Sequence, residues 1–425
     1  MELKKYKLGE ILDVTRGASL SGEFYAAKGE YVRLTCGNFD YQNNCFKENK
    51  AKDNLYYIGD FKPDFLLKEG DIITPLTEQA IGLLGSTAII PESGKYIQSQ
   101  DVAKIVCKEH LLDKDFAFYL ISSNLVKQQL SAAAQQTKIR HTSPDKIKDC
   151  IVWIPELEEQ KRIGKLLRTI DLKIELNRQL NHNLEAMAKQ LYDYWFVQFD
   201  FPDENGKPYK SSGGKMVWDK RLKREIPLLW KAKIVEEVAD VYNGATPSTV
   251  NELNYGGDIV WITPKDLSDQ KQKFVYQGER NISQVGYDSC STHLLPSNTI
   301  LMSSRAPIGL LAIAKTELCT NQGFKSFVSK SKNIATYLYY YLQYHITQIE
   351  QLGTGTTFKE VSREDILKFP MLKPSDNVLD LWEEIVSALN DRQLEIQKEN
   401  ENLIKQRDEL LPLLMNGQVS VNYDL

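Results

Sequence analysis

The chain has 425 residues, 42% of them hydrophobic and 26% charged, which is typical of a globular protein with two or three domains. The net charge of −4 argues against a nucleic-acid binder that works through bulk charge alone, although it allows local basic loops. The opening MELKKYKLGE has no apolar leader, and no apolar run approaches the length of a membrane span, so we expect a cytoplasmic protein without a membrane partner. Six cysteines without a CxxC pair and five scattered histidines predict reduced thiols and no metal site.

An internal duplication is the main organisational feature of the sequence. The matched blocks are residues 10–17 with 237–244 and 81–84 with 308–311 at an offset of 227, Gln100 with Gln322 at 222, and 143–155 with 362–374 at 219. The falling offset indicates small deletions between the blocks, which loops tolerate. The sequence therefore predicts two versions of one frame, called copy 1 (residues 1–155) and copy 2 (residues 231–374).

Each copy shows short β-rich runs separated by turn residues, followed by a helix. The runs predict strands at 11–15, 31–35, 71–74, 87–90 and 102–107 in copy 1, and at 237–241, 258–262, 299–302, 310–314 and 324–328 in copy 2. The helices are predicted at 115–132 and 333–351, with their aromatic residues facing the core. We therefore expect an α+β fold in which each copy is a curved, mainly antiparallel sheet with a helix.

A long helix is predicted directly after copy 1, over residues 156–199, because this stretch is rich in good helix formers and has no proline. Its apolar seam alternates steps of four and three, as in a coiled coil. The seam consists of Ile163, Leu167, Ile170, Ile174, Asn177, Asn181, Leu184, Ala188, Leu191 and Trp195. A lone amphipathic rod of this length needs a partner helix.

The partner is predicted in the same chain, over residues 375–417 and before a short tail at 418–425. At an offset of 219 the seam projects onto Trp382, Val386, Leu389, Gln393, Ile396, Asn400, Leu403, Arg407, Leu410 and Leu414. Pro412 and Gly417 are expected to limit this helix. The polar seam positions Asn177, Asn181, Gln393 and Asn400 are candidates for fixing the register of the pair, or are solvated residues of a frayed middle.

Between the long helix and copy 2, residues 200–230 read as a turn-rich, basic linker. Contact of its basic residues with phosphate or a partner is the alternative interpretation. Those residues are Lys220, Arg221, Lys223 and Arg224.

Catalytic motifs are missing from the sequence. It contains no GxxxxGK[ST] phosphate loop, no HExxH, no GxSxG and no N-P-P-[YF]. We therefore expect no enzyme activity and no cofactor in this chain.

Polar loop residues follow the predicted strands in both copies and offer base-reading chemistry. Gln and Asn can pair with adenine, Arg and Lys with guanine, and Glu can accept from cytosine, while Lys, Ser and Thr suit phosphates. For each single residue a solvated loop is the competing interpretation. The candidate DNA-binding residues are Arg33, Thr35, Asn38, Thr77, Glu78, Gln79, Gln100, Lys138, Arg140 and His141 in copy 1, and Lys265, Ser304, Arg305, Asn321, Gln322, Lys325, Thr357 and Lys359 in copy 2.

Across nearly its whole length the chain resembles the specificity subunit of type I restriction–modification enzymes. The most specific stretches are DLKIELNRQLNHNLEAMAKQLYDYWFVQFDFP, GKPYKSSGGKM and QRDELLPLLMNGQVSV, with YNGATPS and GDIVWITPKDL at the start of copy 2. Copy 1 departs from the last pattern, with TRGASLSGE and YVRLTCGNFD instead.

The resemblance implies that the two copies are target-recognition domains that each bind one half of a split double-stranded DNA site. It also implies that the two long helices pack antiparallel as a spacer. Two methyltransferase subunits carrying S-adenosylmethionine, and restriction subunits using ATP and Mg, would hold the chemistry. Two other readings remain open: a self-contained DNA methyltransferase or nuclease, and a coiled-coil scaffold that binds protein.

Overall fold

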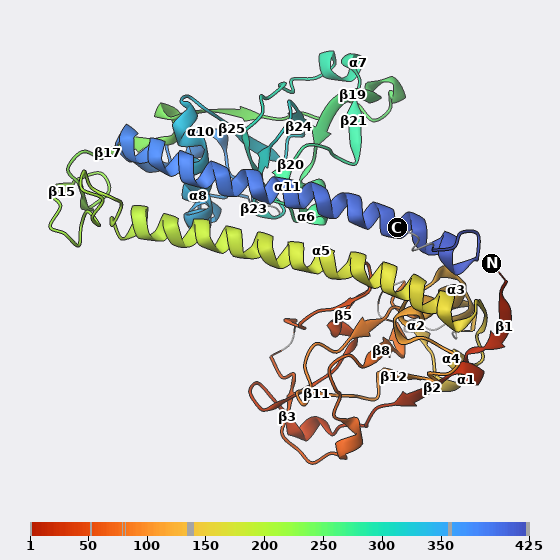
Figure 1. Cartoon of the computed structure of the whole chain (residues 1–425). Coiled ribbons are helices and arrows are strands. Elements are labelled where there is room, and N and C mark those ends of the chain that lie inside the picture. The colour runs from red at the N-terminus through yellow and green to blue at the C-terminus, as the bar shows by residue number, and fades with distance from the viewer. Residues whose placement is uncertain are drawn as a thin grey trace. The chain divides into compact units, whose positions relative to one another are not determined.

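The computed structural model describes residues 2–51, 53–78, 80, 82–133, 140–355 and 359–421 (Figure 1). The chain divides into two compact units. Unit 1 is Met1–Leu176 with Asn400–Leu425, and unit 2 is Asn177–Glu399. Each unit therefore contains one copy of the duplicated frame together with part of both long helices.

Unit 1 is built on two four-stranded sheets, in the orders β10-β8-β12-β2 and β11-β4-β7-β3. The first sheet is antiparallel throughout, whereas β11 and β4 pair in parallel. The strands of the first are β2 (Leu12–Arg16), β8 (Ile72–Pro75), β10 (Ala88–Ile89) and β12 (Val102–Cys107), and those of the second are β3 (Tyr25–Ala26), β4 (Tyr31–Arg33), β7 (Tyr56–Tyr57) and β11 (Tyr96–Ile97). The two-stranded pairs are β1 (Lys4–Lys7) with β14 (Ile151–Ile154), β5 (Phe39–Asp40) with β6 (Cys45–Phe46), and β9 (Thr77–Glu78) with β13 (Arg140–His141). The short helices are α1 (Leu8–Ile11), α2 (Lys114–Ile121), α3 (Asn124–Ala133) and α4 (Pro144–Lys148).

Unit 2 repeats this plan with a five-stranded sheet, β18-β25-β22-β23-β20, and a three-stranded sheet, β21-β19-β24. The strands are β18 (Ala239–Asn243), β19 (Tyr255–Ile262), β20 (Phe274–Val275), β21 (Arg280–Ile282), β22 (Ile300–Ser304), β23 (Ile308–Ala314), β24 (Cys319–Thr320) and β25 (Phe324–Ser329). The two-stranded pairs are β15 (Met216–Asp219) with β16 (Arg224–Pro227), and β17 (Lys231–Ile234) with β26 (Pro370–Lys373). The short helices are α6 (Pro264–Gln270), α7 (Gln284–Asp288), α8 (Ala335–Tyr344), α9 (Ile346–Gln351) and α10 (Arg363–Leu367).

The strand order shows the duplication directly. The order β2-β12-β8-β10 in unit 1 reappears as β18-β25-β22-β23 in unit 2, and the parallel pair β11 with β4 reappears as β24 with β19. Ser143 and Ser362, which match in the sequence, cap α4 and α10 in the same way. The predicted α+β fold class is thus confirmed, and the parallel pairs are an addition that the sequence pattern did not indicate.

The matched glycines mark a close backbone approach in both copies. A methyl group on Gly244 would lie 2.2 Å from the carbonyl oxygens of Thr320 and Asn321. A methyl group on Gly17 would likewise lie 2.2 Å from the carbonyl oxygen of Gln98. Only glycine permits such an approach, which explains why this residue recurs at the same place in the two copies.

Replacing Gly244 by alanine should therefore destabilise unit 2 by about 1–3 kcal/mol, because the backbone must move to admit the methyl group. Denaturant unfolding measures the loss. The matched control is Gly22→Ala, where the nearest atom to the added methyl group is 3.9 Å away. Equal stability of the two variants would contradict the close approach.

Each predicted single helix inside the copies is in fact two helices. The stretch 115–132 divides into α2 and α3 at Ser122, whose hydroxyl donates to the carbonyl oxygens of Phe118 at 3.1 Å and Tyr119 at 3.2 Å and so ends α2. The stretch 333–351 divides into α8 and α9 at His345. The aromatic residues of α2 are buried, as predicted, and so are those of α8 except Tyr344, which is 53% exposed.

The two long helices are α5 (Leu157–Tyr192) and α11 (Asp376–Met415). The helix predicted over residues 156–199 continues beyond α5 as a single π-helical turn, Asp193–Val197, so its helical part ends at Val197 rather than at residue 199. This turn places both Trp195 and Phe196 in the core. Pro412 lies inside α11 rather than limiting it, whereas Gly417, with φ +70°, follows the end of the helix in the left-handed conformation.

Within each unit α5 and α11 lie side by side and antiparallel. In unit 1 Asp171 pairs with Arg407 at 2.9 Å, and the carbonyl oxygen of Ile174 accepts from Asn400 at 3.4 Å. In unit 2 Asn177 donates to Glu399 at 2.8 Å. The apolar seam positions of both helices are buried or half-buried. The prediction of two long antiparallel helices is confirmed.

The polar seam residues flank the division between the units. Gln393 donates to the carbonyl oxygen of Asn181 at 3.2 Å in unit 2. The Oδ1 of Asn181 is buried and accepts no hydrogen bond from the residues that the structure describes. Asn177 is 4% exposed and Asn400 is 9% exposed, so these side chains belong to the interior of the helix pair rather than to a solvated face.

A buried lysine joins the sheet region of unit 2 to both long helices. The ammonium group of Lys273 donates to Glu185 on α5 at 2.8 Å and to Tyr340 on α8 at 2.6 Å. It also donates to Asn390 at 2.7 Å and Gln393 at 3.1 Å, both on α11. Burial lowers the pKa of Lys273 to about 8, although the Glu185 carboxylate acts in the opposite direction.

The stretch predicted as a linker, residues 200–230, is more ordered than its turn-rich sequence suggests. It contains the β15–β16 hairpin, and the rings of Phe201 and Trp230 stack 4.9 Å apart in the aromatic core of unit 2. Among the basic candidates there, Arg224 lies over the Phe199 ring, 5.3 Å from its centre. Lys220, Arg221 and Lys223 are exposed in the turn between β15 and β16.

Candidate nucleic-acid interface

Several predicted residues of copy 2 gather at one end of the strands in the five-stranded sheet. Ser304 ends β22, Lys325 lies at the start of β25, and Arg305 forms a backbone bridge with Glu360. We call Ser304, Arg305, Lys325 and Glu360 rim 2. The antiparallel pairing of β22 with β25 brings the set together although its members are up to 56 residues apart.

Rim 2 is organised around the Glu360 carboxylate. Lys325, whose side chain is only 6% exposed, donates to Glu360 Oε1 at 3.2 Å and to the Ser304 hydroxyl at 3.3 Å. Arg305 Nη1 lies 3.9 Å from Glu360 Oε2, too far for a hydrogen bond. The Arg305 and Glu360 side chains are 39% and 41% exposed, so both present charge to solvent.

The other candidates of copy 2 border rim 2. The carbonyl oxygen of Gly323 accepts from the Ser304 amide at 2.8 Å, which places the loop of Asn321 and Gln322 beside the rim. Asn321 Oδ1 accepts from the Gly323 amide at 2.9 Å, so its side chain shapes the loop. Exposed Gln322 accepts from the Thr246 hydroxyl. Lys265, near the start of α6, pairs with Glu279 at 2.9 Å, and Lys359 is exposed. Thr357 lies outside the described residues.

Copy 1 has an equivalent rim made by β9 and β13. Their pairing sets Glu78 opposite Arg140 and Thr77 opposite His141, and we call these four residues rim 1. Glu78 is buried, and its Oε1 accepts from the Gly82 amide at 2.9 Å. Arg140 lies 3.6 Å from Glu78 Oε2, donates to Ser131 at 2.9 Å and is 40% exposed. Gln79 and Lys138 lie outside the described residues.

Two candidates of copy 1, Arg33 and Asn38, are buried, and Thr35 is half-buried. The Arg33 guanidinium is buried and stacks on Tyr25, 3.8 Å from the ring centre. Thr35 and Asn38 hydrogen-bond each other around a short helical turn, with the Thr35 amide donating to Asn38 Oδ1 at 2.9 Å. Gln100 is exposed, and its carbonyl oxygen accepts from Arg16 at 2.9 Å. The structure thus buries Arg33 and Asn38, half-buries Thr35 and leaves Gln100 accessible.

Glu360 and Thr246 belong to this interface but were not among the predicted residues. Extending the offset of 219 from residues 143–155 back to Arg140 would set this residue against Lys359, whereas the backbone bridges set it against Glu360. The shift by one residue arises from a further single-residue deletion before Ser362. Glu360 could have been predicted because it directly follows Lys359, which was already a candidate.

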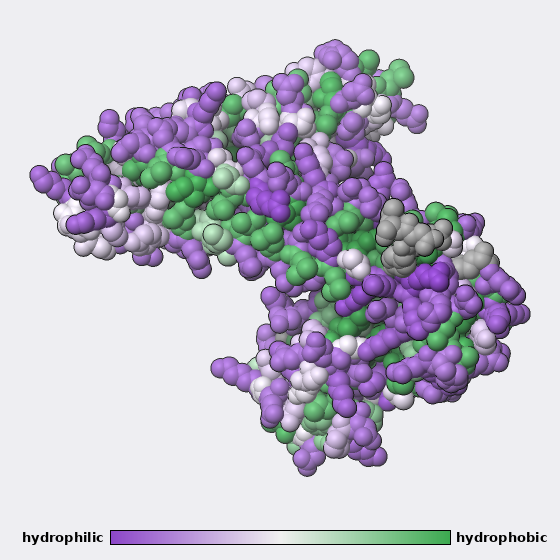
Figure 2. Space-filling view, in the orientation of Figure 1, coloured by the Kyte–Doolittle hydropathy of each residue, from purple (hydrophilic) through white to green (hydrophobic). Residues whose placement is uncertain are grey.

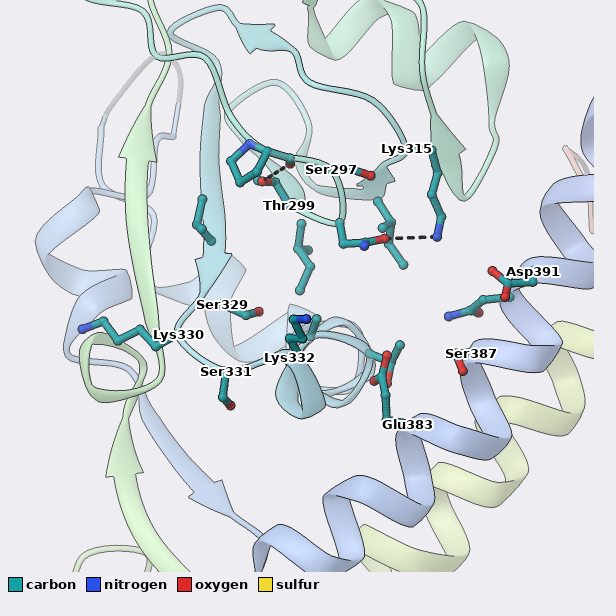
Figure 3. A pocket seen from close by; sticks show the side chains of 18 residues that line it. Ser297, Thr299, Lys315, Ser329, Lys330, Ser331, Lys332, Glu383, Ser387 and Asp391 are labelled. Atoms are coloured by element: carbon teal, nitrogen blue, oxygen red, sulfur yellow. Dashed lines mark hydrogen bonds between the residues drawn. The ribbon is translucent and has the colours of Figure 1, made fainter.

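A polar cavity lies at the opposite ends of the same strands (Figure 3). Its volume is about 610 Å³, and it is lined where β22 begins and where β23 and β25 end, against α11. Figure 3 shows Glu383 and Asp391 on α11 and Lys315 on the sheet side. Burial raises the pKa of Glu383 and lowers the pKa of Lys315. The cavity is thus distinct from rim 2.

In the part of the chain that the structure describes, no helix is both long and apolar enough to cross a membrane. No group of three or more potential metal ligands comes together in the same residues. The six cysteines are free.

Residues 1–186 and 227–406 match the family model described as type I restriction modification DNA specificity domain, once for each copy. The chain belongs to this family. The specificity-domain matches cover both rims and most of the two long helices. The resemblance noted in the sequence is thereby confirmed, and members of this family are specificity subunits rather than catalytic subunits.

Individual members of the family share only part of their sequence with this chain. The MjaIX specificity subunit of Methanocaldococcus jannaschii is 35% identical over 197 residues, which are 45% of this chain and 46% of that protein. This match thus spans about half of the relative's length. The HindI specificity subunit of Haemophilus influenzae is 24% identical over 467 residues, covering 98% of this chain and 99% of the relative. The crystal structure of a type I restriction-modification S subunit from M. genitalium shares the fold, with a TM-score of 0.62 at 15% identity over 98% of this chain and 96% of that chain.

Proposed function

We propose that this chain is the non-catalytic DNA-specificity subunit of a cytoplasmic type I restriction–modification enzyme, with each copy binding one half of a split double-stranded site. Two methyltransferase subunits, carrying S-adenosylmethionine, and restriction subunits, using ATP and Mg, would act at the site that this chain selects. The helix pair would set the spacing between the half-sites.

One observation carries this proposal: the two copies share a frame but carry different polar groups on equivalent rims. Rim 1 exposes an arginine next to a histidine, whereas rim 2 exposes an arginine next to a carboxylate. Side chains of these types read base edges in the major groove. A duplicated frame with unequal rims suits an asymmetric site whose halves differ.

The outer face of α5 supports a partner-binding role for the helices. Leu172 and Leu176 in unit 1 are 47% and 61% exposed, and Leu180 and Met187 in unit 2 are 39% and 55% exposed. A spacing of four residues in unit 1 and of seven residues in unit 2 places each pair on one face of α5, and we call each pair a stripe. Figure 2 shows hydrophobic side chains following the line of α5. We propose that methyltransferase subunits cover these stripes, while Asn177, Asn181, Gln393 and Asn400 fix the register beneath them.

Exchanging residues 1–155 for copy 1 of a family member with a known, different site should change one half-site only. The second half-site and the spacer should stay the same, because copy 2 and both long helices are untouched. Mapping methylated bases in cells that express the chain with its methyltransferase partner gives the first half-site, the second half-site and the spacer. The parent chain is the control. Simultaneous change of both half-sites would refute the modular proposal, and lack of sequence-dependent methylation by the parent complex would favour a scaffold instead.

A further inference from the structure

The acid–base pairs of the two rims occupy the same backbone position with opposite polarity. Glu78 pairs with Arg140 across an antiparallel bridge, and Arg305 pairs with Glu360 across the equivalent bridge. In copy 1 the acidic residue, Glu78, belongs to the earlier of the two bridged segments, whereas in copy 2 the acidic residue, Glu360, belongs to the later one. Two charges exchanged across one bridge keep an ion pair in the fold but alter what each rim presents to a ligand.

The Glu78 and Glu360 carboxylates also differ in whether an oxygen atom remains accessible to a ligand. Glu78 is 7% exposed, and its Oε1 is occupied by backbone amides, so rim 1 presents the Arg140 guanidinium and the exposed His141 but no exposed carboxylate. Glu360 is anchored through Oε1 by Lys325 at 3.2 Å and by Ser304 at 3.5 Å. Its Oε2 accepts no hydrogen bond from a residue that the structure describes, and Arg305 Nη1 lies 3.9 Å from it. Rim 2 therefore offers an acceptor and a donor side by side.

The buried lysine explains how rim 2 keeps a carboxylate at the surface in a fixed place. In the sheet of copy 2, Lys325 lies opposite Asn243. The residue of copy 1 that matches Asn243 is Arg16, and the residue opposite Arg16 is Ala103. Copy 1 thus has no buried cation at this position, and it needs none because Glu78 is held by amides. Lys325 is a positioning residue: it fixes one carboxylate oxygen and leaves the other directed at the rim.

We infer that Glu360, together with Arg305, is a specificity-determining residue of copy 2 that selects a G·C base pair in one orientation. In the major groove guanine presents two acceptors that suit Arg305, and its cytosine partner presents an amino donor that suits Glu360. In rim 1 Arg140 suits a guanine, but no exposed carboxylate is present there for its cytosine partner. This inference rests on the proposed function, because it assumes that the rims face DNA.

The test maps methylated bases in cells that express the full complex with Glu360→Gln. The amide keeps the shape of the side chain but turns one acceptor oxygen into a donor. We expect the preference for one base pair in the second half-site to fall about tenfold, with the first half-site and the spacer unchanged. Asp240→Asn is the matched control, since Asp240 pairs with Lys330 at 3.3 Å in the same sheet but away from rim 2. This control should leave the whole motif intact.

A second variant guards against misfolding, because Glu360→Gln leaves the buried Lys325 without its carboxylate. Lys325→Met with Glu360→Gln removes both charges and should reduce the preference for the same base pair.

The exchange Arg305→Glu with Glu360→Arg should shift the preference toward the reversed base pair. An unchanged second half-site in the assembled variants would overturn the inference while leaving the proposed function standing. A parent complex that methylates no split site would instead refute the proposed function.

Discussion

Inserting seven residues into each long helix, after Leu176 in α5 and after Glu399 in α11, should lengthen the spacer between the methylated half-sites by about three base pairs. Seven residues extend an α-helix by about 10 Å, and B-DNA rises about 3.4 Å per base pair. A heptad returns the seam to the same face of the helix, so the pair can still close. The insertion points coincide with the division between the units, where neither sheet is disturbed.

Methylation mapping of the lengthened chain with its partner gives the result directly. Both half-site sequences should stay the same, since rim 1 and rim 2 are untouched. The control is the same insertion in α5 alone. The Asn177–Glu399 contact of unit 2 and the Asp171–Arg407 pair of unit 1 then cannot both form, so methylation of any defined site should be abolished. An unchanged spacer in the doubly lengthened chain would remove the spacing role from the helix pair.

Replacing Lys273 by methionine should destabilise unit 2 by about 3 kcal/mol. Removing one partner of a buried ion pair commonly costs about 3–5 kcal/mol, because the other charge is left without compensation. We expect the low end of this range because Tyr340 still donates to Glu185 at 3.1 Å, and Gln393 donates to it at 3.4 Å. Denaturant unfolding of the purified chain measures the loss.

Two comparisons sharpen this prediction. Arg392→Met removes an exposed pair with Glu395 at 3.0 Å and should cost less than about 1 kcal/mol. Lys273→Met with Glu185→Leu should recover much of the loss, because no buried charge remains unpaired. A single variant as stable as the Arg392 control would show that Lys273 does not hold the network together.

The cost of Lys273→Met should also grow with pH. The pKa of Lys273 is lowered from 10.5 to about 8 in the folded chain, mainly by burial. Between these values the unfolded chain binds more protons than the folded chain, so stability from this residue rises with pH. Below about pH 8 both states carry the proton and the difference is constant. A stability difference between parent and variant that falls from pH 8 to pH 10 would contradict the lowered pKa.

Most of the architecture was predictable because it depends on periodicity and repetition. The seam of α5 could be read from steps of four and three residues, and its projection located α11. The matched glycines Gly17 and Gly244 are required by close backbone contacts, so they survive in both copies. Such constraints act on single residues or short spacings and therefore leave a direct trace in the sequence.

The details of the interface depend on which atoms meet after folding, and the sequence carries less of that information. Arg33 looked like a base-reading arginine, but tertiary packing stacks it on Tyr25. Glu360 escaped notice because a single-residue deletion shifts it against Arg140, and only the strand bridges reveal the correct pairing. The π-helical turn at the end of α5 likewise follows from burying Trp195 and Phe196 together, which helix propensity does not encode.

The uneven placement of tryptophan gives the two units distinct optical properties. Unit 1 contains only Trp153, which is 41% exposed. Unit 2 contains the other five tryptophans, and Trp195, Trp230 and Trp382 are buried in its aromatic core. Emission from unit 2 should therefore lie at shorter wavelengths and shift red when that unit opens. Intrinsic fluorescence can thus follow the loss of unit 2 without a label, while Trp153 reports on unit 1.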